Sequence, residues 1–217
     1  MTMKLLTMLC LSFLTLGVTS VYADEAAPSN EHSESSNKLG LFVEPGISYE
    51  FSNSTINYPA PFNDHDGNVH GFGLLGRLGF HVADVIFIAA DGRYSRPTFR
   101  DSTGNFDSTA DAYNWGVTGG IQTPVAGLRL WASWILGAGI DPDSVNNFDV
   151  KYSSGSGWRV GAGFYIEALS LNFEYQHIGY DTVEVQQIGA FTPGTSFSGS
   201  ELRNNSYIFS VSFPVAL

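Results

Sequence analysis

Cysteine is nearly absent from this sequence, because its 217 residues contain only Cys10. That cysteine lies inside an apolar run, residues 5–18, which follows the single charge of Lys4 and precedes the small-residue pattern Val21-Tyr22-Ala23. This order is typical of a cleaved signal peptide, which we place at residues 1–23. The mature chain would then contain no thiol, which excludes disulfides and cysteine-ligated metals.

Charge is also scarce, and positive charge most of all. Charged residues make up 14% of the sequence, against about 25% in an average soluble protein. The 10 basic and 21 acidic residues give a net charge of −11 and form no polybasic patch, so a nucleic-acid partner is not expected. Beyond the signal peptide there is no uncharged run long enough for a spanning helix, which needs about 20 apolar residues.

Most of the remaining sequence alternates between apolar and polar residues. Residues 24–37 show no apolar periodicity and predict a flexible acidic linker. From residue 38 to residue 217, segments of about 10 to 14 residues place an apolar side chain at every second position, the pattern of β-strands. We expect one β-domain over 38–217 with eight strands, at 38–52, 69–82, 84–96, 110–122, 128–141, 156–167, 169–181 and 203–216.

The connections between these segments alternate in length. Short links near Ala83, 123–127 and Ala168 alternate with long ones, at 53–68, 97–109, 142–155 and 182–202. Tight turns at one end and long loops at the other are typical of outer-membrane barrels. Val183, Val185, Ile188 and Phe191 in the last long link leave open that strands extend above the membrane.

The two faces of each segment differ sharply in polarity. The fifth segment places Leu128, Leu130, Ala132, Trp134, Leu136, Ala138 and Ile140 on one side. Across all eight segments this apolar face carries no Asp, Glu, Lys or Arg, and only His70 and His177 interrupt it. A charge facing lipid at mid-membrane costs about 2–4 kcal/mol, so lipid contact would enforce the exclusion. A soluble β-sandwich would also keep one face free of charge, but its strands are usually only about five or six residues long.

We therefore expect an all-β fold, an up-and-down antiparallel transmembrane barrel in the outer membrane. Closure removes strand edges, whose unpaired backbone groups would each cost several kcal/mol in lipid. Aromatic residues near segment ends fit interfacial girdles, at Tyr49, Phe51, Phe80, Tyr94, Tyr113 and Trp115. The signal, the eight alternating segments and the aromatic-rich final segment resemble the small eight-stranded outer-membrane barrels of the OmpA and OmpX kind. That group usually ends in an aromatic residue, whereas Leu217 ends this chain and Pro214 interrupts its last segment.

The opposite face of the segments is rich in glycine and carries charges of both signs. These residues are Glu44, Glu50, Arg77, Asp91, Arg93, Arg129, Arg159, Glu167 and Glu174. If Phe51 faces His70, antiparallel register places Glu44 opposite Arg77, and we expect Arg129 and Glu167 at similar depth. The charges form either a packed ionic network or an internal gate. Because eight strands enclose an interior that side chains largely fill, a wide channel is not expected.

Several short motifs suggest chemistry but have simpler explanations. Residues 71–76 spell G-x-G-x-x-G, yet no helix follows to present its N-terminus to a pyrophosphate, so lumen-lining glycines explain them. His177 with Asp181, and His65 with Asp64 and Asp66, are rough catalytic candidates without a well-placed nucleophile. The segments 64–66 and 141–143 could offer carboxylates to Ca²⁺, or could be ordinary acidic loops.

No catalytic, cofactor or metal site is therefore predicted, and we do not expect an enzyme. The leading hypothesis is a structural or surface-interaction protein, adhesin-like, whose external loops contact cells, host molecules or lipopolysaccharide. A narrow channel for small solutes or ions is the alternative, and a lipid A-modifying enzyme the third. Expected partners are outer-membrane lipid, lipopolysaccharide, the insertion machinery and extracellular ligands.

Overall fold

The structure is a computed structural model that describes residues 40–57, 64–82, 85–101, 106–123, 127–166, 168–190, 195–197 and 200–217. The predicted signal peptide and linker lie outside these residues, so both stay predictions. Within them the chain is antiparallel β-structure throughout, with the strand ranges β1 Gly40–Asn57, β2 His65–Val82, β3 Ile86–Ser95, β4 Thr98–Asp101, β5 Phe106–Gln122, β6 Leu128–Pro142, β7 Phe148–Ile166, β8 Leu169–Ile188, β9 Thr195–Phe197, β10 Glu201–Ser212 and β11 Val215–Ala216. No helix in the described part of the chain is long and apolar enough to cross a membrane.

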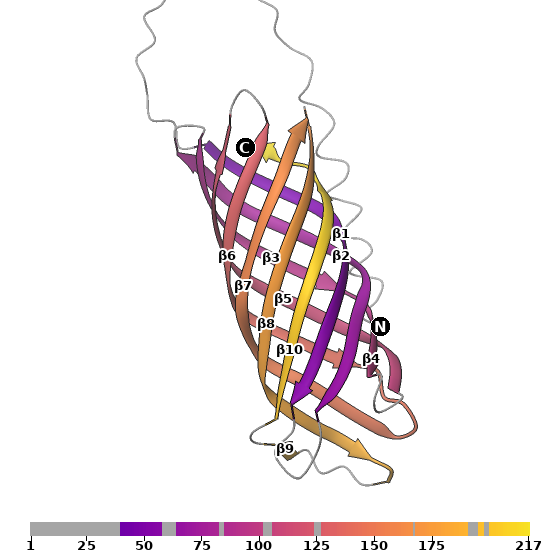
Figure 1. The fold of residues 1–217 in the computed structure, drawn as a ribbon. Helices are drawn as coiled ribbons and strands as arrows, with labels where there is room; N and C mark the ends of the chain where they lie inside the picture. The colour runs from indigo at the N-terminus through magenta and orange to yellow at the C-terminus, as the bar shows by residue number, and fades with distance from the viewer. Residues whose placement is uncertain are drawn as a thin grey trace, which may run out of the picture. The chain divides into compact units, whose positions relative to one another are not determined.

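These strands close into a ring (Figure 1). β3 and β4 together form one position of the ring, because both pair with β2 and with β5. β10 and β11 form another, interrupted at Phe213 and Pro214, and pair with β1. β1 also pairs with β2, which closes the ring, whereas β9 pairs only with β8. Counted over the described residues, the barrel has eight strand positions, and the prediction of an eight-stranded barrel is confirmed.

The strands are longer than the sequence pattern predicted. β1 and β2 contain 18 residues each and β8 contains 20, whereas a tilted strand crosses a membrane in about 9–11 residues. All the extra length lies at the end of the long connections, so much of the predicted links 53–68, 97–109, 142–155 and 182–202 is strand. The predicted strand limits at this end were therefore too short, and strand extension had been left open only for the last link. The residues of these links alternate in polarity, but with the apolar side chains turned inward.

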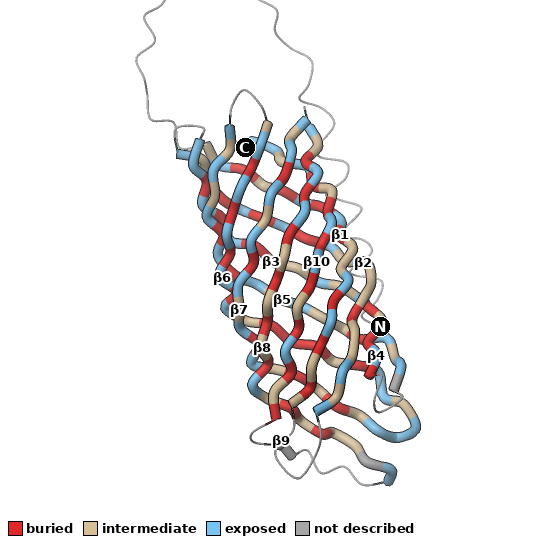
Figure 2. Tube along the Cα trace, viewed as in Figure 1, coloured by how far each residue is buried: buried red, intermediate tan, exposed pale blue. Residues whose placement is uncertain are grey.

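The part of the barrel nearer the short turns is here called the lower section, although it lies at the top of Figures 1 and 2. There apolar side chains point outward and form a continuous belt. Figure 2 shows the resulting alternation of buried and exposed positions along each strand. On β1 the outward residues Leu41, Ile47 and Phe51 are exposed. Aromatic rings gather toward the loop end of the belt and touch across strands, as do Tyr49 and Phe72, whose ring centroids are 4.8 Å apart. This arrangement is that of an interfacial girdle.

Beyond the belt, in the upper section of the barrel, the polarity of the two faces is reversed. Outward positions are polar and exposed, namely Asn53, Asp66, Arg100, Asp107, Asp181 and Arg203. Inward positions form one apolar cluster, here called the upper core, of Ile56, Val69, Phe99, Ala110, Ile135, Ala138, Ile140, Val150, Tyr152, Ile178, Tyr180, Val183, Val185 and Leu202. The upper section is therefore built like a water-soluble barrel, continuous with a membrane barrel below it.

Ala138 and Ile140 correct the predicted faces. The pattern placed them with the lipid-facing residues of their segment, but they are 3% and 2% exposed and point inward. The pairing of β6 shifts its register between Ile135 and Ala138, a β-bulge that moves the following side chains to the other face. The bulge includes Gly137, whose missing side chain leaves room for the indole ring of Trp115.

Candidate functional site

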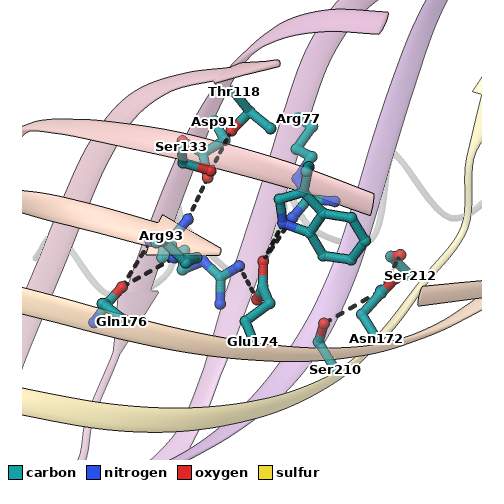
Figure 3. A network of polar contacts seen from close by, with 12 residues as sticks. Arg77, Asp91, Arg93, Thr118, Ser133, Asn172, Glu174, Gln176, Ser210 and Ser212 are labelled. Atoms are coloured by element: carbon teal, nitrogen blue, oxygen red, sulfur yellow. Dashed lines mark hydrogen bonds and ion pairs between the residues drawn. The ribbon is translucent and has the colours of Figure 1, made fainter. Parts of the chain in front are cut away.

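The lumen of the lower section contains a network of buried charges, drawn in part in Figure 3. The structure pairs Glu44 with Arg77 across β1 and β2, as the predicted register requires. Glu44 is wholly buried and accepts two hydrogen bonds from Arg129, each 2.9 Å long. The Nη1 atom of Arg77 lies 3.5 Å from the same carboxylate. Glu44 therefore ties β1 to β2 and, across the lumen, to β6.

Glu174 is the second buried carboxylate that two arginines share. It accepts a 2.8 Å hydrogen bond from Arg77, another from Arg93, and a 2.9 Å bond from the indole nitrogen of Trp131. Its exposed fraction is 0%. A charged carboxylate at this depth requires such partners, because a buried ion without them would be several kcal/mol unstable.

Arg159 organises the part of the network nearer the upper core. It forms an ion pair with Asp91 and donates hydrogen bonds of 3.0 and 2.8 Å to the side-chain oxygen of Gln176. A further bond of 2.6 Å reaches Asn114. One guanidinium thus links strands β3, β5, β7 and β8, which a planar group with five donors can do.

Serine and asparagine side chains line the lumen on β1, β8 and β10. Ser212 donates a 2.6 Å hydrogen bond to Glu44, and Asn172 donates one of 2.9 Å to Ser212. Nearer the upper section, Ser206 donates to Glu50, and Asn204 lies 3.5 Å from the same carboxylate. These short side chains pair with the acidic groups and leave space for the long arginines that reach across from the opposite wall.

Opposite charges in this network are equal in number. The described residues contribute four arginines, Arg77, Arg93, Arg129 and Arg159, and four carboxylates, Glu44, Glu50, Asp91 and Glu174. Glu167, the remaining predicted member, lies outside the described residues. Arg129 instead forms its ion pair with Glu44. Among the described residues, the positive and negative charges of the network are therefore balanced.

Trp131 is the aromatic member of the network, and the sequence analysis missed it as it missed the uncharged polar members. The guanidinium carbon of Arg77 lies 4.6 Å from the Trp131 ring centroid, which is cation–π geometry. A Cβ at Gly161 would collide with the indole, so this glycine makes room for it. Position 131 is two residues after Arg129 and therefore lies on the same inward face of the strand. That spacing was the signal that could have identified Trp131.

The upper core lies between this network and the long connections. Phe99, Ile140 and Leu202 come from three different strands and are each 0–2% exposed. Phe99 and Tyr152 face each other across the interior, with ring centroids 5.7 Å apart. The barrel interior therefore combines the ionic network with an apolar cluster, beside which Ser54, Asp101 and Asn204 are the buried polar side chains.

The other predicted chemical residues lie apart from the lumen network. His177 is held by Asn205, with 2.8 Å between Nδ1 and Oδ1, and among the described residues no serine hydroxyl hydrogen-bonds to it. His65 pairs with Asp101 at 2.9 Å. The described residues include no group of three or more side chains that could hold a metal ion. The glycines of 71–76 lie in β2, with no helix after them.

Asp141 and Asp143 of the segment 141–143 form ion pairs with basic side chains. Lys151 donates a 3.1 Å hydrogen bond to Asp141, which raises the pKa of the lysine. Partial burial and the charge of Asp141 raise the pKa of Asp149 nearby. Asp143 lies 3.5 Å from Arg96. These contacts place the segment in an exposed ion-pair cluster on the upper section.

A closed ring of antiparallel strands, an apolar outer belt and a charged interior define a small outer-membrane β-barrel. No protein-family model matches the sequence, and no curated protein sequence matches it. Among solved structures, Ail of Yersinia pestis in complex with the heparin analogue sucrose octasulfate is similar, with 12% identity and a TM-score of 0.46 over 80% of this chain and 99% of that chain.

Two further barrels give similar values. Neisserial surface protein A has 12% identity and a TM-score of 0.45 over 80% of this chain and 96% of that chain. The outer membrane protein OprG from Pseudomonas aeruginosa has 8% identity and a TM-score of 0.48 over 83% and 98%.

Proposed function

We propose that this protein is a non-enzymatic surface-interaction protein, whose barrel displays binding surface above the outer membrane. The observation that supports this most is the upper section, where the strands continue past the apolar belt around an apolar core. An interior of this kind stabilises a rigid platform in water, and loops on rigid scaffolds commonly carry binding. The long connections and the polar outward side chains are the surface that such a platform presents.

The charges on this platform limit the chemistry of its ligand. Its exposed basic residues are already paired with neighbouring carboxylates: Arg96 with Asp111 and Asp143, Arg100 with Asp107, Lys151 with Asp141, and Arg203 with Glu201. The whole chain has a net charge of −11. A sulfated polyanion, of the kind bound to Ail in its complex, would meet repulsion here, so we expect an uncharged or cationic partner surface.

Adhesion of whole cells tests the proposal. A non-adherent Gram-negative host that displays the barrel should bind cultured epithelial cells several-fold better than the same host with an empty vector. Replacing residues 58–63, 102–105 and 191–194 with Gly-Ser sequences of equal length should remove the gain, because the side chains at these positions are lost while the described strands keep their sequence. A lipid-facing variant, Leu130→Ala, serves as the matched control. Adhesion that survives all three replacements would reject the proposal.

A narrow channel is the second candidate, supported by the buried charges and polar side chains of the lower lumen. Conductance of the purified barrel in planar bilayers tests it, with Glu44→Gln and Arg77→Gln as variants of the lining. We expect no single-channel steps, because the upper core adds an apolar layer above that lining. Steps that change with either variant would favour the channel. An unchanged lipid A profile in cells that carry His177→Ala would argue against the enzymatic alternative.

A further inference from the structure

Phe72 forms a ridge on the lipid-facing wall of β2. Its exposed fraction is 73%, and it stands between Gly71 and Gly73. A Cβ at Gly73 would lie 2.9 Å from the carbonyl oxygen of Tyr94, and one at Gly71 would lie 2.6 Å from the Cα of Pro97. Glycine at both positions therefore allows β2 to lie close against its neighbours β3 and β4, with the Phe72 ring projecting from the wall.

Apolar grooves flank this ridge on both sides. One groove of about 390 Å³ is lined in part by Tyr49, Leu171 and Phe209. The other, of about 330 Å³, is lined in part by Leu74 and Tyr94. Ile47 and Phe72 line both grooves. Each volume falls in the range of ligand sites, about 300–1,000 Å³.

Both grooves cross neighbouring strands: residues of β1, β2, β8 and β10 line the first, and residues of β1, β2 and β3 line most of the second. Ile47 pairs with Leu74, and Leu74 pairs with Tyr94, so the deep end of the second groove lies among belt residues. Arg96 follows Tyr94 by two positions toward the loop end and lines the same groove. The groove thus begins at hydrocarbon depth and ends at a charged side chain.

Charges of both signs surround that end. The Nε atom of Arg96 lies 3.2 Å from Asp111, and its Nη2 atom lies 3.5 Å from Asp143. The Tyr94 hydroxyl donates a 2.6 Å hydrogen bond to Asp111. Side chains of Arg96, Asp111 and Asp143 are each about half exposed. A headgroup that carries both a phosphate and an ammonium group is complementary to this cluster, whereas a purely anionic headgroup meets more carboxylate than cation.

We infer that this wall binds one diacyl phospholipid with a phosphoethanolamine headgroup. Its two acyl chains lie in the two grooves on either side of Phe72, its phosphate contacts Arg96, and its ammonium group contacts Asp111 and Asp143. Hydrocarbon is the natural occupant because the grooves open onto the lipid-facing belt, and two grooves around one ridge match two chains. The two grooves lie on the barrel wall, whereas the Arg96 cluster belongs to the polar exterior that the adhesive platform also presents.

Lipid retention by the purified full chain tests the inference. The barrel is folded in detergent, titrated with phosphatidylethanolamine, and its lipid-bound fraction is measured by native mass spectrometry. Phe72→Ala and Arg96→Gln should each weaken binding at least about fivefold. Two matched controls should leave binding unchanged: Trp134→Ala, which removes another exposed ring of the belt, and Arg100→Gln, which removes an outward arginine that pairs with Asp107. A mobility shift on heating confirms that each variant is folded.

Three results would overturn the inference. Equal weakening by the control variants, or none by Phe72→Ala, would mean that the lipid only surrounds the barrel. Binding of phosphatidylglycerol or of purified lipopolysaccharide as tight as that of phosphatidylethanolamine would contradict the headgroup assignment. The cell-adhesion experiment uses the loops and is read separately, so either proposal can fail alone.

Discussion

Lower and upper sections of this barrel use the same strands in opposite ways. In the lower section leucine, isoleucine and aromatic side chains point outward, and the interior contains the ionic network around Glu44 and Glu174. In the upper section aspartate, asparagine and arginine point outward, and the interior is the upper core. β1 makes the change within six residues, from outward Phe51 and inward Ser52 to outward Asn53 and inward Ile56.

This difference shows that the surrounding medium, lipid or water, determines which side chains point outward. Outward charges in lipid would cost about 2–4 kcal/mol each at mid-membrane, whereas outward apolar groups there cost nothing. Above the membrane, water favours burial of apolar area by about 25 cal/mol for each Å². One antiparallel scaffold satisfies both conditions because hydrogen bonding between strands does not depend on which side chains point inward.

Loss of the Glu174 carboxylate, which Arg77 and Arg93 share, should have the largest effect on stability. Glu174→Gln leaves Arg77 and Arg93 buried without their shared counter-charge, which typically destabilises by about 3–5 kcal/mol. Urea-induced unfolding of the barrel in lipid vesicles measures this. Glu201→Gln, an acidic-to-amide change on the exterior of the upper section, is the control and should be nearly neutral. Similar stability of both variants would show that the lumen network is not required for folding.

A cavity in the upper core should have the next largest effect. Ile140→Ala removes a side chain that is 2% exposed, and buried Ile-to-Ala changes cost about 2–5 kcal/mol. We expect increased proteolysis of the upper section from outside the cell, while the lower section stays protected. Leu130→Ala, on the lipid-facing side of the same strand, is the matched control, because acyl chains can fill the space it leaves. Equal protease sensitivity of the two variants would contradict a separate apolar core.

The smallest effect is expected on the exterior of the upper section. Asp141→Asn removes the carboxylate that raises the pKa of Lys151, and exposed pairs contribute at most about 1 kcal/mol before screening. Because the folded-state pKa is the higher one, this contribution is fully present below the pKa of unfolded lysine, about 10.4, and is lost as the pH rises through the folded value. Unfolding curves of wild type and variant should therefore converge at strongly alkaline pH. A difference that grows as the pH rises would contradict this assignment.

Much of the lower section could be predicted from the sequence. Absence of charge from one face located the lipid-facing residues, and register arithmetic from Phe51 and His70 placed Glu44 opposite Arg77, as the structure does. Both depend only on the two-residue period of a strand and on the order of residues along it. The partner of Arg129 could not be obtained in this way, because Glu44 reaches it across the lumen from a strand far away in the sequence.

The upper section was harder to predict because its alternation is interrupted. At Gly137 the bulge in β6 moves Ala138 and Ile140 inward, and a sequence pattern read with an unbroken period assigns them to the wrong face. Ser154 in β7 has a φ of 56°, a left-handed conformation that also interrupts the regular alternation. In the predicted link 182–202, Val183 and Val185 had left a strand extension open, and β8 does continue to Ile188 with both valines buried.

The sequence by itself determined that this chain forms strands with one face fit for lipid, since the exclusion of charge from alternate positions is local and can be read residue by residue. Only the tertiary structure decided how the interior is filled, and where outside and inside exchange their polarity. Those outcomes depend on barrel closure, bulges and contacts across the lumen, which join residues that the order of the chain keeps far apart.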